Sequence, residues 1–186
     1  MFNTIGISVY QIIAGFAPPI ILAIGLNYAR TKFVKQTVQM ITYMPHFIST
    51  VLIVGMVYQL LSLNGLVNNT LALLGSEKIH FLGEPGLFKS IYVWSGIWQI
   101  TGYRAIIYLA VLSGINPELY EAAVVDGASL WRRIWHIDIP SIMPTAIILV
   151  ILSTARILNV GFEKVFLLQN PMNMQTSDII ATYVYR

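Results

Sequence analysis

Long apolar stretches separated by short polar segments are the main pattern of this 186-residue chain. A helix needs roughly 20 apolar residues to cross a hydrocarbon core about 30 Å thick. Four stretches reach or approach that length, at Ile5–Ala29, Phe47–Leu63, Ile91–Leu112 and Ile142–Val160. The second is short unless residues from Met40 onward extend it, and Ser177–Arg186 has the composition of an opening fifth span. The pattern predicts an all-α fold, a polytopic membrane helical bundle.

Two prolines, Pro18 and Pro19, lie in the middle of the first stretch. Each removes a backbone donor, so we expect a kink there. Membrane helices tolerate such breaks when neighbouring groups satisfy the freed carbonyls. A functional hinge and a static kink that shapes packing both remain open.

The composition excludes an ordinary soluble domain. Charged residues make up 10% of the chain and apolar residues 56%, where about 25% and 45–50% are usual. The net charge of +3 is spread along the chain without a basic cluster, so nucleic acid is not an expected partner. The absence of cysteine excludes disulfides and zinc thiolate sites. We expect an integral membrane protein with the lipid bilayer as its surroundings, and neither a cofactor nor a metal.

Alternation of the four spans places 30–46 and 113–141 on one face of the membrane. The N-terminus, 64–90 and the chain from Gly161 lie on the other face. The first face carries five basic residues and the second carries four. This small excess favours a cytoplasmic position for the first face, because basic residues are retained inside.

The segment Glu121–Pro144 is a charged, helix-forming island between two apolar stretches. Upstream of it, Asn116 and Pro117 form a good helix start. Gly127 suits a left-handed helix end, and Ser129 suits the cap of a second helix. We expect that second helix to run from Leu130 to about His136 and to be terminated by Pro140 and Pro144.

The island presents groups suited to a partner. Ala122 and Ala123 are small enough to let another surface approach the helix backbone. Glu121 and Asp126 offer carboxylates for charge-assisted hydrogen bonds to an arginine. Trp131 and Trp135, four residues apart, place two indoles on one face, as in a helix that lies at the headgroups. A docking surface and an amphipathic connector resting on the bilayer both fit these residues.

The spacing Glu-Ala-Ala, three residues, Gly, nine residues, Ile-x-x-Pro resembles the EAA loop of binding-protein-dependent permeases, the transmembrane subunits of type I ABC importers. The matching positions are Glu121, Ala122, Ala123, Gly127, Ile137 and Pro140. Asp126 and Ala128 fit the common Asp-Gly-Ala extension, whereas Ile139 stands where the family usually has leucine. TYMPHFIST at Thr42–Thr50 and IIYLAVLSGINPELYEAA at Ile106–Ala123 are similar to the carbohydrate branch, above all to LplB-like oligosaccharide permeases.

The resemblance implies a function. The chain would be a permease subunit for a sugar, expected to be an oligosaccharide, with ATP hydrolysis in a separate ATPase subunit rather than in this chain. Glu121–Pro140 would be the cytoplasmic coupling helix region, seated on that ATPase, with Glu121 paired to a basic residue. The implied partners are a second permease subunit, two ATPase subunits and an extracytoplasmic solute-binding protein. A full member would have one more span on each side, so four of a probable six are expected here.

Motifs for other chemistry are missing from the sequence. There is no phosphate-binding G-x-x-x-x-G-K-[ST] loop and no H-E-x-x-H zinc motif. His136 and Asp138 lie two residues apart on the expected membrane surface, where we expect both to be solvated rather than catalytic. The alternative to transport is a non-transporting scaffold or sensor that recruits a soluble partner through the same loop.

The third stretch contains aromatic and polar residues of the kind that commonly bind sugars, so we expect the sugar pathway there. Gln99, Tyr103 and Arg104 are the candidates. Arg104 lies near the expected midplane, where an arginine costs on the order of 2.5–3.5 kcal/mol. Lining the pathway and pairing inside the subunit are both open for it. Trp94 and Trp98 lie near the outer end, where an aromatic belt is expected anyway.

Overall fold

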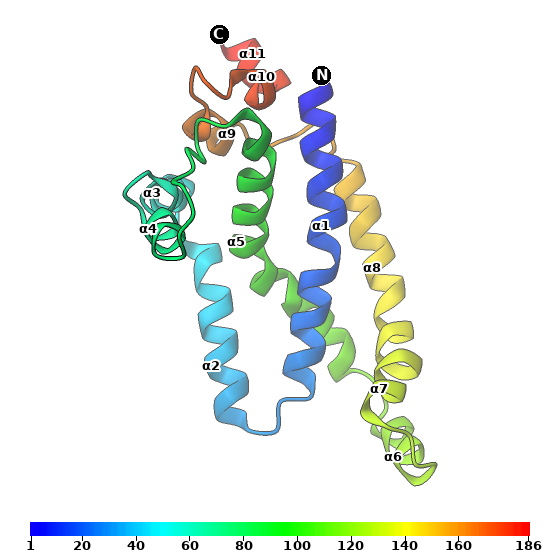
Figure 1. Ribbon diagram of the computed structural model, residues 1–186. Helices are drawn as coiled ribbons and strands as arrows, with labels where there is room; N and C mark the ends of the chain where they lie inside the picture. The colour runs from blue at the N-terminus through cyan, green and yellow to red at the C-terminus, as the bar shows by residue number, and fades with distance from the viewer. The chain divides into compact units, whose positions relative to one another are not determined.

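The computed structural model describes all residues, 1–186, and contains helices and no strand, which confirms the predicted fold class. The larger helices are α1 (Phe2–Asn27), α2 (Lys32–Tyr43), α3 (Thr50–Leu61), α5 (Pro85–Ser113) and α8 (Ile139–Thr154). The shorter ones are α4 (Leu66–Leu73), α6 (Pro117–Val125), α7 (Leu130–Arg133), α9 (Phe162–Leu168), α10 (Met174–Ser177) and α11 (Ile180–Tyr185). Figure 1 labels these helices along the chain. A 3-10 turn covers Met44–Phe47, and a π-helical segment covers Ile134–Asp138.

The chain divides into two compact units. Unit 1 comprises Met1–Gln11, Phe47–Trp98 and Arg156–Arg186, and unit 2 comprises Ile12–His46 and Gln99–Ala155. Helices α1 and α5 each contribute residues to both units. The residues expected to dock a partner all belong to unit 2.

Three segments are long and apolar enough to cross a membrane: Phe2–Asn27, Thr50–Leu73 and Leu130–Thr154. They overlap the first, second and fourth predicted spans. Helix α5 contains the third predicted span and is 29 residues long, but it is not among the three because its middle carries polar groups such as Gln99, Thr101 and Arg104. Pro18 and Pro19 lie inside α1 without ending it.

The second of these segments is not one continuous helix. Helix α3 ends at Leu61 and α4 begins at Leu66. At the turn between them, a Cβ on Gly65 would lie 2.4 Å from the carbonyl oxygen of Gln59, so the backbone approaches too closely for any side chain there. Helix α3 alone, with 12 residues, is about 18 Å long at 1.5 Å per residue, well short of a bilayer core.

The expected helix end at Pro140 is wrong. One helical segment runs from Leu130 to Thr154, through α7, the π-helical segment and α8, with Pro140 and Pro144 inside it. The amide of Ile139 donates to the carbonyl of Ile134, five residues back. This wider turn comes just before Pro140, a residue that has no amide hydrogen to donate, and the helix continues past both prolines.

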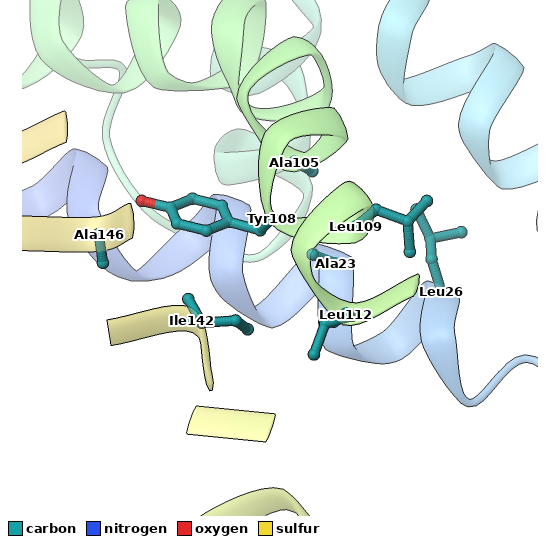
Figure 2. Close-up of a cluster of buried hydrophobic side chains, with 8 residues drawn as sticks. All are labelled: Ala23, Leu26, Ala105, Tyr108, Leu109, Leu112, Ile142 and Ala146. Carbon is teal, nitrogen blue, oxygen red and sulfur yellow. The ribbon is translucent and has the colours of Figure 1, made fainter. Parts of the chain in front are cut away.

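The core of unit 2 is formed by three helices. Figure 2 shows its side chains converging from α1, α5 and α8. They are Ala23, Leu26, Ala105, Tyr108, Leu109, Leu112, Ile142 and Ala146. Small alanines from all three helices lie in this core, which lets helix backbones approach closely, as is common between membrane helices. This packing positions the N-terminal half of α8 and the segment that leads into it.

A buried asparagine fixes loops in unit 1. Asn173 is 1% exposed, and its amide donates to the carbonyls of Leu82 and Leu168, both at 3.1 Å. Its oxygen accepts from the amide of Asn170 and the hydroxyl of Ser177, both at 3.0 Å. Such a side chain closes a loop by satisfying backbone groups that would otherwise be buried without partners.

Candidate functional site

Helix α6 begins as the sequence predicts. The side chain of Asn116 accepts from the amide of Glu118 at 3.1 Å, and Pro117 occupies the first turn, where no amide hydrogen is needed. Glu118 lies in the first turn, near the positive end of the helix dipole. Local chemistry therefore specifies this short helix.

The turn after α6 depends on Gly127. Its φ is +71°, in the left-handed region that favours glycine. The amide of Ala128 donates to the carbonyl of Ala123 at 2.8 Å, and that of Gly127 to the carbonyl of Val124 at 3.0 Å, which closes the helix end. Ser129 then caps α7 by accepting from the amide of Arg132 at 3.4 Å. The predicted helix–glycine–helix is confirmed at this point.

The surface of α6 and the following turn is exposed and largely apolar. Glu121, Ala122, Asp126 and Gly127 are exposed, whereas Ala123 and Ala128 are half-buried. Neither Glu121 nor Asp126 forms a salt bridge, since the one salt bridge in the structure joins Arg186 and Asp178. The side chain of Val125 beside them is 87% exposed. Free carboxylates next to exposed apolar side chains suit a binding surface for a basic partner.

The two tryptophans lie on a second exposed surface. Trp131 is 70% exposed and Trp135 is 62% exposed. The remaining motif positions, Ile137 and Pro140, lie further along the same helix, with Ile137 half-buried and Pro140 exposed. The structure thus divides the candidate residues between the α6 turn and the helix that leads into the membrane.

The expectation of a solvated Asp138 is wrong. His136 is exposed and bonds to the carbonyl of Arg132, but Asp138 is 0% exposed. The hydroxyl of Tyr120, on α6, donates to Oδ1 of Asp138 at 2.5 Å. Burial, and then the hydrogen bond and the charge of Asp138, raise the pKa of Tyr120, so its hydroxyl keeps the proton that it donates.

Asp138 lies on the buried face of its helix. Ile134, Asp138, Ile142 and Ala146 are all buried, at a spacing of four residues. Residues four apart share a helix face, so a carboxylate interrupts an otherwise apolar stripe. Tyr28, which follows α1, lies close to Asp138 and under the guanidinium of Arg133, 5.8 Å from its ring centre.

Gln99, Tyr103 and Arg104, the three pathway candidates, all lie in one six-residue stretch of α5. The ring of Tyr103 stacks on that of His46 at 4.0 Å, so part of its face is covered. Arg104 and Gln99 are half-buried. A Cβ on Gly102 would lie 2.0 Å from the carbonyl oxygen of Thr42, so α5 meets the end of α2 closely just before Tyr103. The structure brings these residues to a helix crossing, and their use by a sugar stays a prediction.

Lys164, on α9, is a buried cation that the sequence did not single out. Its side chain is 7% exposed, and its ammonium donates to the carbonyl of Tyr92 at 3.1 Å and lies 5.1 Å from the centre of that ring. No carboxylate pairs with it, and burial lowers its pKa to about 8. The only signal in the sequence is its apolar neighbours, such as Val165.

Comparison with known proteins gives consistent matches. Residues 15–186 match the family described as "Binding-protein-dependent transport system inner membrane component". The chain is 38% identical to protein LplB and 40% identical to the polygalacturonan/rhamnogalacturonan transport system permease protein YteP, both of Bacillus subtilis (strain 168). Each alignment covers 98% of this chain and 58% or 57% of the relative, so the chain spans just over half of their length.

A solved structure matches the whole chain. It is the crystal structure of a bacterial ABC transporter involved in the import of the acidic polysaccharide alginate, with a TM-score of 0.95 and 43% identity over 100% of this chain and 65% of that one. A second structure of the alginate transporter, in complex with an alginate pentasaccharide-bound periplasmic protein, matches equally well. These relatives are transport proteins, in agreement with the predicted class of a transport subunit rather than an enzyme. The chain belongs to the family of inner membrane components of binding-protein-dependent transport systems.

Proposed function

We propose that this chain forms the core of the membrane-spanning permease subunit of an ATP-driven importer for a sugar. The observation that carries the proposal is the exposed α6–Gly127–α7 surface, with its unpaired carboxylates, at the positions that resemble the EAA loop. Family membership supports transport. In this proposal the surface docks onto a separate ATPase subunit on the cytoplasmic face.

In this proposal, the side chains and the turn of this surface couple ATP binding to movement of the spans. Glu121 and Asp126 bind basic side chains of the ATPase, and the exposed Val125 fits an apolar recess there. Gly127 sets the angle between the two short helices because its backbone lies in the left-handed region. When two ATPase subunits close on ATP, the docked helices of this chain and a second permease subunit move, and the spans alternate between inward- and outward-facing states.

The substrate class is proposed as an oligosaccharide delivered by an extracytoplasmic solute-binding protein. The alginate importer matched here is known in complex with a sugar-loaded periplasmic protein, and YteP is named for polygalacturonan and rhamnogalacturonan. Alginate and polygalacturonan both carry carboxylates, so acidic oligosaccharides are the first to test. In that case Arg104 would pair with a sugar carboxylate, while Tyr103 and Gln99 would contact ring and hydroxyl groups.

The test is uptake by the complete importer in proteoliposomes. Glu121→Lys reverses the charge at the docking surface, and Gly127→Pro forbids the positive φ of the turn. Both variants should insert normally but lose ATP-driven uptake and fail to retain the ATPase subunit during purification. Glu77→Lys, the same charge change at another exposed carboxylate, is the matched control and should transport normally.

Three outcomes test these assignments. Undiminished uptake by either loop variant contradicts the coupling assignment. If a soluble protein other than an ATPase co-purifies with the wild-type loop and no uptake occurs, the chain belongs to a scaffold or sensor instead. An ATPase whose activity rises with sugar-loaded binding protein supports transport.

A further inference from the structure

A group of buried polar atoms in unit 2 lacks hydrogen-bond partners. Four buried side-chain atoms in the structure have none, and three of them belong to Tyr28, Arg133 and Asp138. They are the hydroxyl of Tyr28, Nε of Arg133 and Oδ2 of Asp138. Native proteins satisfy nearly all such groups, so three unsatisfied atoms in one cluster need an explanation.

The cluster joins three parts of unit 2. Tyr120 belongs to α6, which carries the exposed Glu121 and Ala122. Asp138 ends the π-helical segment that leads into α8, and Tyr28 directly follows α1. The one hydrogen bond between side chains of these residues runs from Tyr120 to Asp138. This hydrogen bond ties α6 to the helix that continues into α8.

The place of Asp138 in its helix is also unusual. It is 0% exposed between the apolar Ile134 and Ile142, and it ends a π-helical segment. π-Helical turns are rare and occur frequently at functional sites. A buried carboxylate with one oxygen unsatisfied costs stability, so stability alone does not account for it.

We propose that Asp138 is a positioning residue that ties α6 to the membrane helix formed by the π-helical segment and α8, and so transmits movement of the docked loop to the spans. The inference rests on the proposed coupling function. The unsatisfied Oδ2 and the hydroxyl of Tyr28 beside it provide a second pairing within the cluster. Movement of α6 forms or breaks the bond from Tyr120 to Asp138, and the hydroxyl of Tyr28 can donate to the carboxylate when that bond is broken, which gives the two arrangements that a coupling element requires.

The experiment measures sugar transported per ATP hydrolysed by the complete reconstituted importer. Asp138→Leu removes the carboxylate that accepts the hydrogen bond and puts an apolar side chain of similar volume in its place. Tyr120→Phe removes the hydroxyl that donates it. In both, the ATPase should remain bound and active, because Glu121 and Gly127 are unchanged, but the ratio should fall at least tenfold. Asp138→Asn keeps an oxygen that accepts from Tyr120 and should keep most of the ratio. Glu77→Leu, at an exposed carboxylate outside α6 and outside the proposed docking surface, is the control and should leave the ratio unchanged.

The double variant Tyr120→Phe/Asp138→Leu separates positioning from simple stability. Replacing both partners by apolar groups leaves neither group unsatisfied, so the amount of folded protein should recover. If the transport ratio stays low in this folded variant, the positioning role is supported. If the ratio recovers with folding, or if either single variant keeps the wild-type ratio, the inference is overturned. Failure of the wild-type loop to bind any ATPase instead contradicts the proposed function.

Discussion

Two clusters of buried polar side chains, one in each unit, differ in how many of their hydrogen-bonding groups have partners. In unit 1, Asn173 makes four side-chain hydrogen bonds, and Asn68, which is 0% exposed, makes three. In unit 2, Asp138 uses one oxygen and leaves the other without a partner, and the hydroxyl of Tyr28 beside it is also unsatisfied.

The number of unused hydrogen-bonding groups determines how firmly a buried cluster fixes the segments that it joins. A side chain whose donors and acceptors are all used has one favourable arrangement, so it fixes the loops that it joins. A cluster with unused donors and acceptors can form further pairings, so its arrangement is less strictly fixed. The asparagines of unit 1 form the first kind of network, although the buried side-chain nitrogen of Gln169 in the same unit has no partner. The cluster of unit 2, where α6 meets the helix that continues into α8, is of the second kind.

The largest expected effect on stability comes from Asn173→Leu. The change removes four hydrogen bonds, including those that the buried carbonyl of Leu168 and the buried hydroxyl of Ser177 make with this side chain. We expect a loss of about 3–4 kcal/mol in the free energy of unfolding. The measurement is unfolding of the purified protein in lipid nanodiscs.

Asn69→Leu is the matched control for that variant. Asn69 is exposed and donates one hydrogen bond, to the carbonyl of Asn64. The control should cost less than about 1 kcal/mol. If Asn173→Leu costs no more than this control, the difference between the two units disappears.

Lys164→Met removes a buried cation in unit 1 that no carboxylate pairs with. Burial lowers the folded-state pKa of Lys164 to about 8 from 10.5, so the charged form destabilises the fold. The penalty is fully present below pH 8 and declines as the pH rises from 8 towards 10.5. We expect the variant to gain roughly 2–3 kcal/mol at pH 6 and much less at pH 10, measured as a pH series of unfolding.

Lys78→Met is the comparison for Lys164→Met, because Lys78 is exposed and bonds to the side chain of Asn64. It should show no gain at any pH. A gain for Lys164→Met that does not vary with pH would show that apolar packing, rather than the buried charge, accounts for it.

The loop from Asn116 to Ser129 was predictable because its structure is local. The cap at Asn116, the left-handed Gly127 and the cap at Ser129 each depend on a few neighbouring residues. Residue type at each position is enough to specify such features. Its chemistry as a binding surface remains a prediction.

The burial of Asp138 was predicted wrongly because the second helix was expected to run only to about His136 and to be terminated by Pro140. With the helix continued through the π-helical segment, Ile134, Asp138, Ile142 and Ala146 form one stripe. Asp138 is bonded to Tyr120 and lies close to Tyr28, which are 18 and 110 residues away from it in the sequence. Helix packing decides such contacts, and no local pattern records them. The same reason explains why the burial of Lys164 was not foreseen.

The smallest expected effect tests the unsatisfied hydroxyl itself. Tyr28→Phe removes a buried group that has no hydrogen-bond partner, so the free energy of unfolding should change by less than about 1 kcal/mol. Tyr120→Phe removes a bond to a carboxylate and should cost roughly 1.5–3 kcal/mol. Both variants keep the aromatic ring, so unfolding measured side by side compares one used hydroxyl with one unused hydroxyl in the same cluster. Equal losses for the two would mean that Tyr28 is bonded as firmly as Tyr120, and the cluster would then be as rigid as the asparagine networks of unit 1.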